Sequence, residues 1–120
     1  MNQILVTIII PAYNEKNNIV RIIEEVNKNV SYRKQIIVID DFSKDGTTEI
    51  IKNLKNINKS IFHQKNQGKG AAIKSSLPFI QGDIVAIQDA DLEYNPTDLN
   101  KLVSEILSGR TNVAYGSRVL

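Results

Sequence analysis

Carboxylate side chains follow two apolar runs of strand length. Asp41 comes after the Val- and Ile-rich run 36–39, and Asp89 and Asp91 come after the run 84–87. Carboxylates gathered at one place repel one another unless they share a cation. Mg²⁺ and Mn²⁺ are hard divalent cations that take oxygen ligands. We therefore expect Asp89 and Asp91 to hold such an ion together with diphosphate oxygens. The alternative is a solvated turn in which Asp91 caps a local backbone group.

Polar residues after the first two apolar runs allow two interpretations each. Asp41 lies where a carboxylate can accept a hydrogen bond from a ribose hydroxyl or a base N–H, whereas Asp40 is expected only to cap its loop. Asp45 is typical of a turn and a helix cap, with ligand contact as the alternative. Tyr13 either stacks on a base or packs on its own loop. The Asn14 side chain is expected to cap the first helix.

Basic residues are candidates for contacts to phosphate. Lys69 stands between Gly68 and Gly70 at a predicted helix start, where an anion is favoured, and the alternative is a flexible basic turn. The segment is not a Walker loop, since the glycine spacing and the Ser or Thr are missing. Arg118 could donate two hydrogen bonds to a phosphate. His63, a lone histidine in a strand-like stretch, is expected to be structural.

Apolar runs of strand length alternate with segments of helical spacing. Nearly continuous Val and Ile runs suit strands covered on both faces, as in a parallel sheet. Asn95 before Pro96 predicts the start of the last helix and Gly109 its end. Pro78 predicts that the helix near Gly70 ends around residue 77. Strands are predicted over 5–10, 35–39, 61–63, 84–87 and 112–115, and apolar helical stripes over 19–30, 50–57, and 99–107.

This alternation predicts an α/β fold with three layers, α/β/α, around a mainly parallel sheet. The 120 residues are expected to form a single domain, 1–120. The net charge of +2 gives no overall field toward nucleic acid, and the lack of cysteine excludes disulfides and thiolate sites. The apolar run near the N-terminus is too short for a membrane span and is not typical of a signal peptide. A cytoplasmic protein is expected.

Taken together, these segments resemble family 2 glycosyltransferases, which have the GT-A, nucleotide-diphospho-sugar transferase-like fold. The resemblance is greatest to the branch that transfers mannose or glucose to dolichyl or polyprenyl phosphate. One such motif would be weak evidence, but these occur in the family's order over almost the whole chain. The matching segments are PAYNE at 11–15, IDDFSKDGT at 39–47, NQGKG at 66–70, QDADLE at 88–93 and YGSR at 115–118.

The resemblance implies roles for the matching residues. Asp89 and Asp91 would be the metal–diphosphate pair, and Glu93 would be a further metal contact where the mannosyltransferase branch often has glutamine. Arg118 would contact the donor phosphate, so Asp89, Asp91 and Arg118 are the residues expected to act in catalysis. With Lys69 included, the predicted nucleotide-sugar site comprises Pro11, Ala12, Tyr13, Glu15, Ile39, Asp41, Lys69, Ala90, Asp91 and Arg118.

The resemblance also implies an inverting displacement that passes a sugar from a nucleoside-diphosphate donor, of the GDP-mannose or UDP-glucose type, to the acceptor. A Mg²⁺ or Mn²⁺ ion would neutralise the charge that develops on the leaving diphosphate. A lipid-phosphate acceptor is already ionised and needs no strong general base, and its use would bring the protein to the cytoplasmic face of a membrane. Family members continue beyond the GSR segment at 116–118. The chain is therefore expected to be C-terminally truncated and to bind nucleotide with little or no turnover.

Two other classes of function remain as alternatives. A nucleotide-binding module could keep the pocket without catalysis. In a metal-dependent phosphotransferase or phosphatase, the first Asp of an Asp-x-Asp pair is a nucleophile after an early strand. Here the pair follows a late strand. A dehydrogenase is disfavoured because the first strand leads into residues 11–15, which lack a glycine-rich turn. The sequence leaves open the base, the sugar, the acceptor and the oligomeric state.

Overall fold

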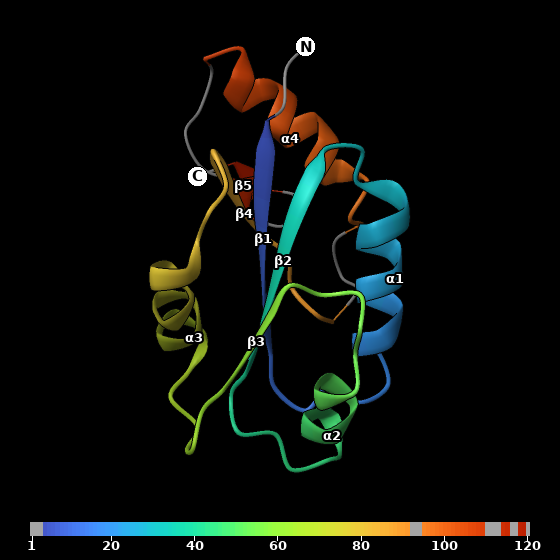
Figure 1. The fold of residues 1–120 in the computed structure, drawn as a ribbon, viewed down its shortest axis with the longest axis vertical. Coiled ribbons are helices and arrows are strands. Elements are labelled where there is room, and N and C mark those ends of the chain that lie inside the picture. The colour runs from blue at the N-terminus through green and yellow to red at the C-terminus, as the bar shows by residue number, and fades with distance from the viewer. Residues whose placement is uncertain (1–3, 92–94, 110–113, 116–117, 120) are drawn as a thin grey trace.

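The computed structural model describes residues 4–91, 95–109, 114–115 and 118–119. Strands and helices alternate through most of this range (Figure 1). The strands are β1 (Leu5–Ala12), β2 (Arg33–Asp40), β3 (Lys59–Phe62), β4 (Ile84–Ile87), β5 (Ala114–Tyr115) and β6 (Arg118–Val119). The helices are α1 (Ile19–Asn29), α2 (Thr47–Lys52), α3 (Lys69–Ser76) and α4 (Asp98–Leu107), with a 3₁₀ turn η1 (Leu77–Phe79) after α3.

The described strands form one sheet in the order β3-β2-β1-β4-β5-β6. The pairs from β3 through β5 are parallel, and β6 runs antiparallel to β5. The chain builds outward from β1 through β2 to β3 and then returns to place β4 on the other side of β1. A reversal of this kind opens a crevice beyond the carboxyl ends of the central strands, where α/β proteins bind ligands.

Helices cover both faces of the sheet, so the predicted three-layer α/β/α architecture is confirmed. On one face, Ile8 and Ile10 of β1 belong to a buried cluster with residues of α1, α2 and α4. On the other face, Ile9 of β1 packs in a smaller cluster that includes Ala72 of α3. Figure 1 shows α3 on the side of the sheet opposite α1 and α2. Because successive side chains of a strand point to opposite faces, the continuous Ile and Val runs supply both layers.

Most predicted elements are present, with shifts at their ends. β4 covers the predicted residues, and β1 and β2 are longer than predicted. The last helix begins at Asp98, where Asn95 and Pro96 predicted an earlier start. Asn95 Oδ1 nevertheless accepts a hydrogen bond of 2.9 Å from the backbone N–H of Thr97, which caps the turn before α4. α3 ends before Pro78 as predicted, and Gly109 follows α4 with φ of 84°.

Two features of the elements differ from the sequence prediction. The helical stripe over 50–57 forms only the short helix α2, although Leu54 and Ile57 still pack against the core. Strand β6 was not expected. Among the described residues, no helix has the length and apolar character needed to cross a membrane.

Candidate functional site

A cavity of about 380 Å³ opens beyond the carboxyl ends of β1, β2 and β4. It lies at the reversal of strand order, so the loops after these strands meet there although they are far apart in sequence. α3 closes a further side with its first turn. The cavity is lined by Pro11, Ala12, Tyr13, Glu15, Asp41, Lys69, Ala72, Asp89, Ala90 and Asp91.

The alternation of side chains along β2 sends Asp40 and Asp41 to opposite faces of the sheet. Asp40 follows the row of Val38 and lies toward α2, where its Oδ2 accepts a hydrogen bond of 2.5 Å from Thr48 Oγ1. Asp41 follows the row of Ile39 on the α3 side and lines the cavity. Asp40 therefore holds a helix in place, in agreement with its expected structural role, and Asp41 is available to the cavity.

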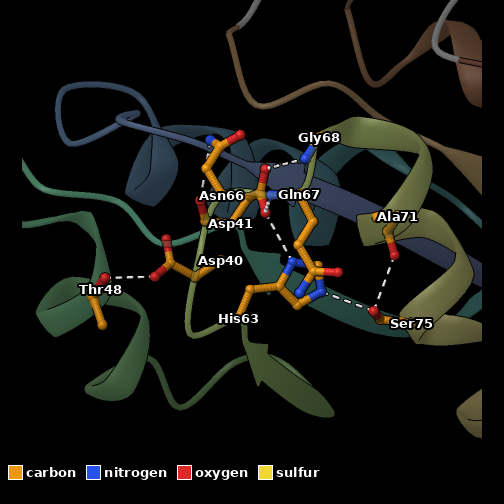
Figure 2. A network of polar contacts seen from close by, with 9 residues as sticks. All are labelled: Asp40, Asp41, Thr48, His63, Asn66, Gln67, Gly68, Ala71 and Ser75. Atoms are coloured by element: carbon orange, nitrogen blue, oxygen red, sulfur yellow. Dashed lines mark hydrogen bonds and ion pairs between the residues drawn. The ribbon is translucent and has the colours of Figure 1, made fainter.

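The Asp41 carboxylate is the centre of a buried network of hydrogen bonds (Figure 2). Its Oδ1 accepts from the backbone N–H of Gln67 at 2.9 Å, and its Oδ2 accepts from that of Gly68 at 2.8 Å. His63 Nδ1 lies 2.8 Å from Asp41 Oδ1, and His63 Nε2 lies 2.8 Å from Ser75 Oγ. The network thus fixes the loop that leads into α3 against the end of β2.

These contacts keep Asp41 ionised. Burial acts to raise the pKa of this carboxyl group, but the hydrogen bonds from Gln67, His63 and Gly68 outweigh it, so the pKa lies below the usual 3.8. Because an ionised carboxylate only accepts hydrogen bonds, Nδ1 of His63 carries the hydrogen that it shares with Asp41. Asp41 therefore contributes a fixed negative charge at the cavity wall.

A lysine forms an ion pair with one of the predicted metal ligands. Lys69 Nζ contacts Asp89 Oδ1. Asp89 follows β4 in the row of Val85 and Ile87, which faces α3, so the alternation of the strand brings this carboxylate to the first residue of the helix. The side chain of Lys69 is 42% exposed and that of Asp89 is 14% exposed. The cavity therefore carries a cation next to the Asp-x-Asp segment.

The loop after β1 is held by the loop after β2. Asn14 adopts a left-handed backbone with φ of 54°, and its Oδ1 accepts a hydrogen bond of 2.8 Å from the backbone N–H of Lys44. Its own N–H donates to Ser43 Oγ at 2.9 Å. The prediction that Asn14 caps the first helix is therefore wrong. Asn18 occupies that position in α1 and makes no side-chain cap hydrogen bond.

Asp45 has the turn and capping role that the sequence predicted. Its Oδ1 accepts hydrogen bonds from the backbone N–H and the hydroxyl of Thr47, at 3.0 and 2.5 Å. Its Oδ2 accepts from the backbone N–H of Lys16 at 3.2 Å. Burial acts to raise the pKa of Asp45, but these hydrogen bonds lower it below 3.8. The residue lies outside the set that lines the cavity.

Three predicted site residues are not among the described residues that line the cavity. One is buried in the core, and for the other two the structure does not describe the side chain. Ile39 is fully buried in the core on the α3 side and does not line the cavity. Glu93 is outside the described residues. Arg118 pairs with Tyr115 between β6 and β5, but its side chain is outside the described part of the structure. The roles implied for these three residues stay predictions.

The sequence matches one protein family over nearly its whole length. The family model described as Glycosyl transferase family 2 matches residues 7–120. The chain belongs to glycosyltransferase family 2. Curated relatives of this glycosyltransferase chain include the putative glycosyltransferase CsbB of Bacillus subtilis, 41% identical over 107 residues, 84% of this chain and 32% of the relative. The dolichol-phosphate mannosyltransferase of Pyrococcus furiosus is 33% identical over 116 residues, 94% of this chain and 33% of the relative.

Solved structures of glycosyltransferases share the GT-A-like fold of the chain. A mannosyltransferase from Pyrobaculum calidifontis in complex with GDP-Man and Mn²⁺ has a TM-score of 0.73 at 25% identity, over 85% of this chain and 32% of that one. Glucosyl-3-phosphoglycerate synthase from Mycobacterium tuberculosis, in complex with Mn²⁺, UDP and glucosyl-3-phosphoglycerate, has a TM-score of 0.71 at 26% identity, over 88% and 40%. The chain therefore spans between 32% and 40% of the length of these four proteins.

The contact of His63 with the site was not predicted from the sequence of this family 2 glycosyltransferase chain. The register of the parallel pair β2–β3 explains the contact, and the sequence alone does not give this register. Asp40 pairs with Phe62, so the next residues along, Asp41 and His63, lie level with each other at the carboxyl edge. A histidine in that place can donate to the carboxylate without leaving the core.

Proposed function

We propose that the chain forms the nucleotide-sugar-binding part of an inverting glycosyltransferase. The observation that carries the proposal is the cavity at the strand reversal, which brings Asp89 and Asp91 together with Asp41, Lys69 and Tyr13. Relatives in complex with GDP-Man or with UDP support a nucleoside-diphosphate sugar as donor, of the GDP-mannose or UDP-glucose type. In this assignment, Tyr13 and Asp41 bind the nucleoside, and the Asp-x-Asp side of the cavity binds the diphosphate.

Asp89 and Asp91 are the residues that would hold a Mg²⁺ or Mn²⁺ ion. No group of three His, Cys, Asp or Glu side chains suited to an ion is present within the described ranges, and Glu93, the further predicted metal contact, lies outside them. The diphosphate and water would supply other ligands. The chemistry of the carboxylates fits a cation, because Asp89 is already paired with a positively charged group, the ammonium of Lys69. A divalent ion supplies charge neutralisation at the leaving diphosphate. Relatives in complex with Mn²⁺ support this cofactor.

The proposed acceptor is a polyprenyl or dolichyl phosphate at a membrane surface. Support comes from relatives named for dolichol phosphate, in Pyrococcus furiosus, and for undecaprenyl phosphate, in Aeromonas hydrophila, the latter 32% identical over 112 residues. The phosphate of such an acceptor is already ionised, so the attacking oxygen needs no strong base from the protein. The residues of this chain would then act by binding and orienting the donor.

Calorimetric titration of the chain with GDP and UDP, each with and without Mn²⁺, tests the proposal. We expect Mn²⁺-dependent binding of one of the two nucleotides, which would also assign the base of the donor. Absence of binding to both nucleotides, by a chain shown to be folded by circular dichroism, would contradict the proposed function.

The variant Asp91→Asn tests the metal assignment. Asp91 is exposed, so the change is expected to leave the fold intact, whereas loss of a ligand charge should weaken Mn²⁺-dependent nucleotide binding by about tenfold or more. Glu24→Gln, on the exposed face of α1, removes the same charge away from the cavity and serves as the control. If Asp91→Asn and Glu24→Gln bind the nucleotide with the affinity of the unmodified chain, Asp91 is not part of the site.

A further inference from the structure

Lys69 forms an ion pair with Asp89, a carboxylate that is a metal ligand under the proposed function. Its Nζ contacts Asp89 Oδ1, and both side chains line the cavity together with Asp91. The fold determines the position of Lys69, because Asp41 accepts hydrogen bonds from the two backbone N–H groups that precede it, those of Gln67 and Gly68. The backbone at Lys69 is therefore held in place, whereas its side chain is 42% exposed.

We propose that Lys69 is the resident counter-ion of Asp89, and that it leaves this carboxylate for the diphosphate when the divalent ion binds. The inference rests on the proposed function of the cavity. An ammonium group and a divalent ion at the same carboxylate oxygen repel each other, so the ion gains the full attraction of Asp89 only after the lysine moves. The flexible four-carbon stem of lysine allows the move without repacking of the core.

This exchange couples the two ligands of the site. Without nucleotide, a metal ion must separate the Lys69–Asp89 pair, and the displaced ammonium group has no phosphate to contact. With nucleotide, the diphosphate supplies a new partner for Lys69, so the metal ion and the nucleotide each strengthen binding of the other by the same factor. Lys69 therefore lowers the affinity for the metal ion alone and raises the affinity for the metal ion together with the nucleotide.

Titration of Mn²⁺ followed by electron paramagnetic resonance tests the inference, first with the metal alone and then with GDP or UDP present. Lys69→Met removes the ammonium group and keeps much of the apolar stem. We expect Lys69→Met to bind Mn²⁺ alone about fivefold more tightly than the unmodified chain, the effect of removing one half-buried ion pair. In the same variant, the factor by which nucleotide strengthens Mn²⁺ binding should fall by at least about fivefold.

Lys74→Met is the matched control. Lys74 lies in the same helix, α3, and is exposed, and the cavity lining does not include it. Its replacement makes the same change of charge and should leave both Mn²⁺ affinities unchanged. If Lys69→Met and Lys74→Met bind Mn²⁺ alone equally, including the case in which neither binds it, the inference is overturned. Failure of the unmodified chain to bind either nucleotide with Mn²⁺ would instead contradict the proposed function, and the comparison with Mn²⁺ alone would still decide the role of Lys69.

Discussion

The Asp41 carboxylate connects three segments that are distant in sequence. It lies directly after β2, accepts hydrogen bonds from the backbone N–H groups of Gln67 and Gly68, and contacts His63, which lies directly after β3. A buried carboxylate is stable only when its oxygens are paired. The same pairing that makes Asp41 tolerable in the interior also fixes the loop before α3, so at the scale of one residue the stability of the fold and the geometry of the cavity depend on the same bonds.

His63→Leu is expected to lower the free energy of unfolding by about 2 kcal/mol, because Asp41 loses one of its buried donors. Urea denaturation measures the change. Ser75→Ala leaves the Asp41–His63 contact in place but removes the hydroxyl that contacts His63 and donates to the backbone oxygen of Ala71, and it should cost about 1 kcal/mol. An unfolding free energy of His63→Leu equal to that of the unmodified chain would show that the Asp41–His63 bond contributes nothing.

At the scale of single residues, the sequence predicted which carboxylates lie at the cavity better than it predicted their side-chain contacts. Asp41, Asp89 and Asp91 were identified because carboxyl ends of parallel strands meet at one edge, and all three line the cavity. The Lys69–Asp89 and Asp41–His63 contacts could not be predicted, since each depends on which face a side chain takes after its strand ends. That choice follows from the alternation of the strand and the register of its neighbour, neither of which the sequence states directly.

The junction between β3 and α3 is the element that brings Lys69 to the cavity. Gly68 stands before the helix with φ of 94° and donates its N–H to Asp41. Residues other than glycine are strained in this backbone region. The junction therefore needs a glycine for its conformation, and Asp41 for its position against the sheet.

Gly68→Ala and Gly70→Ala are expected to change stability in opposite directions. Gly68→Ala should lower the free energy of unfolding by about 1–2 kcal/mol, because alanine is strained at positive φ. Gly70 lies inside α3, and an added Cβ would meet nothing within 4 Å, so Gly70→Ala should raise the free energy by up to about 1 kcal/mol. Urea denaturation of both variants gives the signs, and a common sign would contradict this account of the junction.

Prediction of elements succeeded where local chemistry decides the structure. Pro78 ends α3 and Gly109 follows α4, because each acts on its own backbone. The capping role of Asn14 was wrong because the side chain bonds to Lys44, 30 residues away, in the neighbouring loop. Local signals give the candidate cap, but a tertiary contact decides which backbone group the side chain satisfies.

At the scale of the whole molecule, the two hydrophobic layers were predictable and the charge arrangement was only partly so. Continuous Val and Ile runs require cover on both faces, and α1, α2 and α4 on one side and α3 on the other supply it. The net charge of +2 gave no indication of how charges are grouped. The cavity gathers Asp41, Asp89 and Asp91 at one edge of the sheet, and folding must stabilise these carboxylates there.

The free energy of unfolding of the whole chain is therefore expected to fall in acid as particular carboxylates become protonated. The pKa values of Asp41 and Asp45 are lowered in the folded chain, so the stabilisation they provide is fully present above the unfolded value of 3.8 and is lost as the pH falls below it. Urea denaturation between about pH 5 and about pH 2.5 measures the decline. Asp41→Asn should make the dependence on pH shallower below 3.8, since its share no longer titrates, whereas Glu24→Gln should keep the slope of the unmodified chain. Equal slopes in all three proteins would mean that Asp41 has the same pKa folded and unfolded, and that its hydrogen bonds to Gln67 and Gly68 do not favour the charged form.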